Sequence, residues 1–297
     1  MRGARPERAL DPLVRRVAAW QPGERVLVAC SGGPDSVALA SLLDRLGRED
    51  GVAIVVGHVN HGVRASAAQD ECVVLAVGAR LGLPVAIARP RPDAADEAAL
   101  RGARYAALIA LARAHGAASV ATAHTAEDQT ETVLLALFRG TGLAGLAGMP
   151  ARRPLAPGVD LVRPVLRATH AELWTELRRS GLPYVLDPTN AELRYRRNAL
   201  RAQLEALRSA FPQLDRAVAR CAAIVRDDLE ETDRAARRRA VRARLRARGA
   251  LRDATFADID AAAGREPREP GAASSRSEPS EDAADAPDRH RTGPDHA

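Results

Sequence analysis

The chain has 297 residues, of which 46% are hydrophobic and only 3% aromatic, so it can form one large domain or two modest ones with cores of Leu, Val and Ala. Its net charge of +6 comes from 44 arginines, with no lysine, against 38 acidic residues, which favours an anionic partner such as nucleic acid or a nucleotide. The absence of an apolar run of about 20 residues excludes a membrane span, and three scattered cysteines argue against a disulfide framework or a zinc site (Cys30, Cys72 and Cys221). We therefore expect a cytoplasmic protein with reduced cysteines.

The order of elements predicts an open, mostly parallel α/β sheet with helices on both faces. A leader helix is expected within residues 1–24, with an apolar face formed by Leu10, Leu13, Val14 and Val17. Short apolar runs predict strands at residues 26–29, 52–59, 84–88, 119–123 and 161–166. Helical spacing predicts helices at residues 66–81, 97–115 and 171–180, the first of them with Cys72, Val73, Leu75 and Ala76 turned inward.

A glycine-rich loop joins the first strand to its helix, with the sequence Ser31-Gly32-Gly33-Pro34-Asp35-Ser36. The two glycines can adopt backbone angles that other residues avoid, and they let backbone N–H groups approach a ligand. Ser36 is a candidate N-cap, and the positive end of the helix dipole then faces the loop. Such a helix N-terminus suits a phosphate group, although a glycine-rich turn can also be purely structural.

A second polar cluster follows the fourth strand, in the segment ATAHTAEDQTET at residues 121–132. The carboxyl ends of parallel strands share one edge of the sheet, so His124 and Asp128 should face the glycine-rich loop. Acidic residues in a first helical turn also suit the helix dipole, which is the structural alternative. Because Mg²⁺ is usually held by one or two carboxylates plus substrate phosphate, this edge predicts a magnesium site.

The second half of the chain is rich in arginine. After a glycine-rich connector at residues 139–149, a turn at Asp187–Asn190 leads into Arg197 and Asn198, a pattern that favours contact with an anion or nucleic acid. Residues 199–263 are predicted to be helical, with a basic stripe that would contribute weakly to RNA binding, and residues 264–297 are predicted to be disordered. The predicted division is a catalytic domain (residues 1–198), a helical extension (199–263) and a tail (264–297).

Several motifs in this order resemble the tRNA(Ile)-lysidine synthase family of the PP-loop ATP pyrophosphatases. They are CSGGPDSVAL, HVNHGVR, ARYAAL, TAHTAEDQTETVLL, RGTGLAGLAGM and DPTNAELRYRRNALR, which span residues 26–201. The resemblance implies an adenine nucleotide alpha hydrolase-like fold and a C–N bond-forming ligase. It implies ATP and Mg²⁺ as co-substrate and cofactor, and the CAU-anticodon isoleucine tRNA and free L-lysine as partners. The wobble cytidine would be adenylated on its 2-carbonyl, and lysine would then displace AMP.

The resemblance also implies roles for individual residues. The pyrophosphate would be bound by Ser31, Gly32, Gly33, Pro34, Asp35 and Ser36, with His61 and Arg139 as further nucleotide-site residues. Asp35 and Asp128 would hold magnesium, and the catalytic group would consist of Asp35, Asp128, Arg104 and His124. The tRNA or substrate would be contacted by Asp187, Asn190, Arg197 and Asn198.

Two departures from the family pattern are visible. Glu127-Asp128 stands where the family usually has Asp-Asp, so a metal role for Glu127 is not implied. Longer family members carry a further C-terminal tRNA-binding domain, whereas this sequence continues into a polar tail. A homodimer is compatible with the sequence, which does not fix the oligomeric state.

Three alternatives remain open from the residues. A tRNA thiolase has the same phosphate loop, but such relatives typically use paired cysteines, a spacing that the three cysteines lack. A small-molecule amidating ligase, similar to NAD synthetase, would not need the arginine-rich second half. A non-catalytic RNA-binding protein would not need the intact Asp35 and Ser36.

Overall fold

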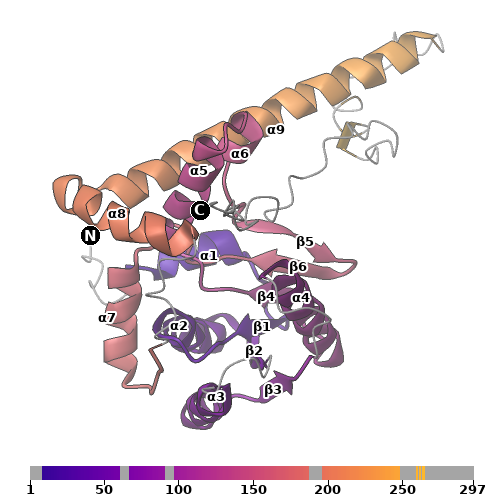
Figure 1. Ribbon diagram of the computed structural model, residues 1–297. Coiled ribbons are helices and arrows are strands. Elements are labelled where there is room, and N and C mark those ends of the chain that lie inside the picture. The colour runs from indigo at the N-terminus through magenta and orange to yellow at the C-terminus, as the bar shows by residue number, and fades with distance from the viewer. Residues whose placement is uncertain are drawn as a thin grey trace, which may run out of the picture.

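The computed structural model describes residues 9–60, 67–90, 97–186 and 196–247, together with residues 259, 261, 263 and 264. Its centre is a six-stranded sheet in the order β3-β2-β1-β4-β6-β5 (Figure 1). All neighbouring pairs are parallel except β5–β6, so the predicted open, mostly parallel sheet is confirmed. The strands are β1 (Arg25–Ala29), β2 (Ala53–Val59), β3 (Val85–Ala88), β4 (Ser119–Ala121), β5 (Arg152–Ala156) and β6 (Val159–Val162).

Helices surround the sheet and continue beyond it. The first group is α1 (Asp11–Ala18), α2 (Pro34–Asp50), α3 (Ala67–Leu81), α4 (Glu97–Ala114) and α5 (Ala126–Phe138). The second group is α6 (Leu143–Leu146), α7 (His170–Ser180), α8 (Arg196–Ala210) and α9 (Leu214–Ala247). None of the described helices is both long enough and apolar enough to cross a membrane.

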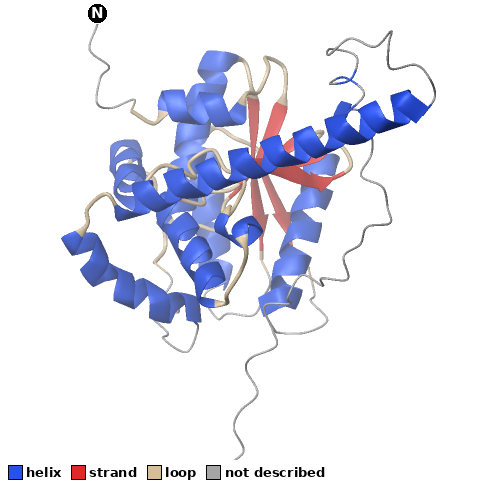
Figure 2. Cartoon of the chain, turned by 90° about the horizontal axis from the view of Figure 1, so that it is seen from above, coloured by secondary structure: helices blue, strands red, loops and turns tan. Residues whose placement is uncertain are grey.

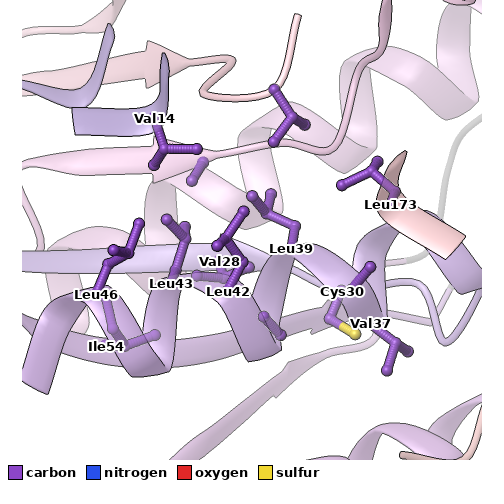
Figure 3. Close-up of a cluster of buried hydrophobic side chains, with 14 of the residues drawn as sticks. Val14, Val28, Cys30, Val37, Leu39, Leu42, Leu43, Leu46, Ile54 and Leu173 are labelled. Carbon is purple, nitrogen blue, oxygen red and sulfur yellow. The ribbon is translucent and has the colours of Figure 1, made fainter. Parts of the chain in front are cut away.

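Side chains of the central strands alternate between two cores, as the period of two in a strand requires. Val26 and Val28 point into a large core under α1, α2, α3 and α7, which also contains Leu39 and Leu42 of α2 (Figure 3). Leu27, between them, points into a smaller core on the opposite face, which α4 covers with Leu108. The predicted placement of helices on both faces is therefore confirmed.

Two details of these elements differ from the sequence-based expectation. Helix α3 buries Val74 and Val77 and packs Val73 against the core, whereas Cys72 and Leu75 are exposed, so the predicted inward face was wrong at these two positions. The reason is that its apolar residues run almost continuously, which leaves the helical face undefined by periodicity. Strand β5 was not predicted because RRPLA shows no alternation, and it pairs antiparallel at the edge of the sheet, where Pro154 is tolerated.

The arginine-rich extension, predicted to be helical, contains two helices within the described residues, separated at Phe211-Pro212-Gln213. The 34 residues of α9 form a rod of roughly 51 Å, and its second half extends past the sheet in both views (Figures 1 and 2). Arg226 anchors the first half, because its guanidinium donates to the carbonyl groups of Ala147 and Met149. The predicted domain boundary at residue 198 falls inside α8, and the division into domains stays a prediction.

The core predicts a contrast between two leucine substitutions. Leu42 is fully buried between α2 and the sheet, so Leu42→Ala should lower the free energy of unfolding by about 2–5 kcal/mol. Leu75 is 44% exposed, so Leu75→Ala should change it by less than about 1 kcal/mol. Urea denaturation followed by circular dichroism measures both values, and equal losses would contradict this description of the core.

Candidate active site

The glycine-rich loop is held by its own serine hydroxyl groups. Gly32 has φ +89°, a conformation that glycine adopts readily, whereas Gly33 has φ −73° and does not need to be glycine for its backbone angle. The hydroxyl of Ser36 donates to the carbonyl of Gly33 at 2.8 Å and accepts from the N–H of Ser31 at 3.2 Å. The loop is thus fixed before any ligand arrives.

The expected N-cap of α2 needs correction. Gly33 occupies the N-cap, Pro34 takes the first helical position, and Ser36 lies within the first turn. The fixed φ of proline fits that first position, where no backbone N–H is needed, so the helix begins earlier than a Ser36 cap would allow. The prediction that the loop leads directly into a helix N-terminus is nevertheless confirmed.

Three helix N-termini meet beside this loop, those of α2, α5 and α7. Asp35 in the first turn of α2 accepts from the ring nitrogen Nδ1 of His170, the first residue of α7, at 2.9 Å. The backbone N–H of His170 donates to Oε1 of Glu127, in the first turn of α5, at 3.0 Å. Since each N-terminus carries the positive end of a helix dipole, their convergence favours an anionic ligand.

His170 carries a positive charge at neutral pH. Burial lowers the pKa of its imidazole, but the hydrogen bond to Asp35 and the charges of Asp35, Glu127 and Asp128 raise it further, to about 9. An imidazolium therefore lies among three carboxylates. The sequence analysis did not identify this residue, although the capping-box pattern Thr169-His170-Ala171-Glu172 marks the start of a helix just after a predicted strand.

The second polar cluster also assembles at the carboxyl edge of the sheet. Asp128 caps α5, because its Oδ2 accepts from the backbone N–H of Thr125 at 2.9 Å. Burial raises the pKa of Asp128, but His124 and the Thr125 N–H lower it more strongly, so the net shift is downward. Burial lowers the pKa of His124 to about 4, and its Nδ1 lies 2.9 Å from the hydroxyl of Thr122. His124 is accordingly neutral at physiological pH.

Glu131 joins α5 to α8. Its carboxylate is fully buried and binds Arg197 at 3.0 Å and Arg201 at 2.8 Å. Arg197 also donates to the hydroxyl of Thr132 at 3.1 Å. Arg197, predicted to contact tRNA or substrate, is therefore held near Asp128 by a buried carboxylate, and about a third of its side chain stays exposed.

Other predicted site residues lie elsewhere or outside the described residues. Arg139 is exposed at the C-terminal end of α5, eleven residues or roughly 16 Å along the helix from Asp128, so the structure does not bring it to the cluster. Arg104 lies on the exposed side of α4, and Asn198 is half-buried on α8. His61, Asp187 and Asn190 lie outside the described residues. The individual roles predicted for these residues stay predictions.

The carboxylates suit a magnesium ion that a phosphate helps to bind. Oδ1 of Asp35 and Oε2 of Glu127 are both buried and lack a hydrogen-bond partner. Oδ1 of Asp128 lies 4.0 Å from Arg201, while its Oδ2 is engaged in the cap. Within the described parts of the chain no group of three or more His, Cys, Asp or Glu side chains is placed to hold a metal ion.

Comparison with known proteins defines the class. The family model of the PP-loop domain matches residues 6–207, so the chain belongs to the PP-loop domain family. Within that class it is similar to proteins named tRNA(Ile)-lysidine synthase. It is 43% identical to that of Methylobacterium nodulans over 197 residues (64% of this chain, 57% of the relative). It is 40% identical to that of Gloeobacter violaceus over 211 residues (70% and 65%). The resemblance predicted from the motifs is confirmed.

The chain spans less than two thirds of the length of these curated relatives. Among solved structures, it is similar to the U34-tRNA thiolase NcsA from Methanococcus maripaludis. The TM-score is 0.60 and the sequence identity 16%, over 72% of this chain and 76% of the thiolase. At this identity the likeness supports the fold alone, and it agrees with a parallel sheet that carries a PP-loop.

The His170–Asp35 ion pair predicts a pH dependence of stability. The pKa of His170 is raised from 6.5 to about 9, so the contribution of the pair is fully present below pH 6.5 and is lost as the pH rises through 9. The difference in unfolding free energy between the wild type and His170→Gln should therefore decrease as the pH rises from 6.5 to 9. Urea denaturation in the presence of EDTA measures this difference. An NMR titration of His170 with a midpoint at or below 6.5 would contradict it.

Glu131 predicts a large effect on stability. Glu131→Gln should lower the free energy of unfolding by about 3 kcal/mol, since the neutral amide cannot balance two arginines around a buried position. Glu205→Gln is the matched control, because Glu205 is exposed on α8. Thermal and urea denaturation provide the comparison, and a loss no larger than that of the control would show that Glu131 does not join the two helices.

Proposed function

We propose that this protein ligates lysine to C2 of the wobble cytidine of an isoleucine tRNA with a CAU anticodon, using ATP and releasing AMP and pyrophosphate. The observation that carries the proposal is the similarity to proteins named tRNA(Ile)-lysidine synthase, which extends over 64% of the chain. A site with three converging helix N-termini is consistent with a substrate that carries phosphates.

The first step is adenylation. The 2-carbonyl oxygen of cytidine attacks the α-phosphorus of ATP, and the bond to the β,γ-pyrophosphate breaks. The loop at Ser31–Ser36 would bind the departing pyrophosphate through backbone N–H groups at the start of α2, with the charged His170 beside it. A magnesium ion held by Asp35, with Asp128 or Glu127 nearby, would supply charge neutralisation for the phosphates.

The second step is transfer. The ε-amine of lysine attacks C2 of the adenylated cytidine, AMP leaves, and the amine loses a proton. The carboxylate of Asp128 is a candidate acceptor for that proton, because it is ionised and the neutral His124 lies beside it. Water must be excluded so that lysine, and not water, attacks C2. The half-buried positions of Asp128 and His124 favour this exclusion.

The tRNA would approach along α8 and α9. Arg197 and Asn198 lie at the start of α8, and several exposed arginines follow on the projecting half of α9, namely Arg234, Arg237, Arg239 and Arg242. Such a row neutralises phosphates and releases counterions, which gives affinity without sequence selectivity. The selectivity for the CAU anticodon would come from the site itself.

A thiolase reaction is the alternative that the test must exclude. Cys30 is buried at the base of the loop, and burial raises the pKa of its thiol, which disfavours a reactive thiolate. Cys72 lies on α3 and Cys221 on α9, so the three cysteines belong to different elements. The described structure therefore offers no paired cysteines for sulfur transfer.

The deciding experiment is incubation with ATP, labelled lysine and an isoleucine tRNA transcript with a CAU anticodon. We expect label in the tRNA together with equimolar AMP and pyrophosphate. A transcript with a GAU anticodon is the control and should remain unlabelled. Formation of ADP in place of AMP, or modification only when a sulfur donor is present, would overturn the proposal.

Asp35 provides the second test. Asp35→Asn should lower the rate of pyrophosphate release at least about 100-fold, because it removes a charge beside the phosphate loop while the side chain keeps its shape. The matched control is Asp44→Asn on the same helix, where Asp44 pairs with Arg48 at 2.9 Å. Similar rates of release for both variants would remove Asp35 from the mechanism.

A further inference from the structure

Three arginines gather around one tyrosine beyond the phosphate loop. Arg101 of α4 and Arg153 of β5 place their guanidinium carbons 5.8 and 5.9 Å from the centre of the Tyr105 ring. Arg163, which directly follows β6, interacts electrostatically with Tyr105, Arg153 and Arg101. None of these three arginines belongs to the carboxylate cluster around His170, and none takes part in the adenylation and transfer steps proposed for that cluster.

Among the described side chains, the cluster carries positive charge and no carboxylate pairs with it. Arg163 is 2% exposed, its Nη1 donates to the carbonyl of Pro150 at 2.8 Å, and its Nε is buried without a partner. Across the described ranges, no carboxylate lies within 4.0 Å of the guanidinium nitrogens of Arg101, Arg153 or Arg163. Burial lowers the pKa of Arg163, and the charges of Arg153 and Arg101 lower it as well.

A buried, unbalanced cation is unfavourable unless a ligand supplies the opposite charge. Surface ion pairs elsewhere in this chain satisfy exposed arginines, for example Arg15 with Asp50 and Arg152 with Asp160. By contrast, Arg163 is buried with an Nε that has no partner, and Arg101 and Arg153 both lie over one tyrosine ring, which favours an anion-binding site over a solvated basic surface. Arg101 is exposed and Arg153 half-buried, so an anion can reach these two from solvent.

The strand order places this cluster beside the transfer site. Arg163 follows β6 and His124 follows β4, which are parallel neighbours, and the phosphate loop follows β1 on the other side of β4. With neighbouring strands about 4.8 Å apart, Arg163 is roughly 10 Å across the sheet from the loop. The charge of Arg163 also contributes to the low pKa of His124. The cluster is thus close to the reacting groups but separate from the triphosphate.

We propose that Arg101 and Arg153 bind the α-carboxylate of the amino-acid nucleophile, and that Arg163 positions Tyr105 between them. This inference rests on the proposed function. Guanidinium groups match a carboxylate in shape and charge, and water screens Arg163 little because it is buried. With its carboxylate bound here, the four-carbon stem of lysine directs the ε-amine toward His124 and Asp128. A tRNA phosphate is the alternative ligand, and the salt dependence of tRNA binding separates the two.

The test compares lysine with 1,5-diaminopentane, which has the same terminal amine but no carboxylate. Transfer to the CAU-anticodon tRNA is measured for both amines. For the wild type we expect the kcat/KM for lysine to exceed that for the diamine by about 10- to 100-fold, the usual effect of charge-assisted hydrogen bonds. The double variant Arg101→Gln/Arg153→Gln should raise the KM for lysine by a similar factor and reduce the preference to near one.

Arg16→Gln is the matched control, since Arg16 is exposed on α1, a helix that carries none of the three clustered arginines. It should keep the preference for lysine. Stabilisation by lysine in a thermal shift assay gives a readout independent of turnover, and the double variant should lose that stabilisation.

Three outcomes would overturn the proposal. A double variant that still prefers lysine would show that the arginines do not bind its carboxylate. A variant whose KM for ATP rises in parallel would place them at the nucleotide. A variant whose main change is weaker tRNA binding with a smaller salt dependence would place them on the RNA backbone. A wild type that transfers no amine would instead refute the proposed function, and this subsite with it.

Discussion

The contact on which the candidate site depends is the one between His170 and two carboxylates. Asp35 accepts a hydrogen bond from the ring nitrogen of His170, and Glu127 accepts one from the backbone N–H of His170. A single residue therefore joins the N-termini of α2, α5 and α7. Each of those helices starts directly after a strand or loop at the carboxyl edge of the sheet, where ligands of open α/β sheets bind. The positive charge of His170 balances carboxylates that would otherwise repel one another when buried together.

Acidic and basic side chains occupy separate regions along the carboxyl edge of the sheet. The carboxylates of Asp35, Glu127 and Asp128 surround His170 beside the phosphate loop, while the arginines at 101, 153 and 163 gather beyond β4 around Tyr105. His124 lies between the two regions and stays neutral because it is buried. This arrangement is consistent with the proposed reaction, in which one end of the site would bind ATP with magnesium and the other end the carboxylate of lysine.

The arginine-rich helices are part of the same structure rather than an independent appendage. Glu131 of α5 forms ion pairs with two arginines of α8. Arg226 of α9 donates hydrogen bonds to the carbonyl groups of Ala147 and Met149, which follow α6. Gln129 completes this junction by pairing with the backbone of Met149 at 2.8 and 3.0 Å, and a side chain on Gly148 would collide with its amide. The segment that includes Asp128 is therefore supported from the side opposite the sheet.

The sequence by itself determined the elements that local pattern controls. Apolar runs and glycine punctuation located β1, β2, β3, β4 and most helices, and the motif SGGPDS located the phosphate loop, because backbone conformation and periodicity are properties of neighbouring residues. It did not reveal His170, the partners of Glu131 or the arginine cluster, and it misassigned the inner face of α3. Only the tertiary structure decided these, since each depends on side chains from distant segments that burial brings into one electrostatic environment, where charge pairing and desolvation set their state.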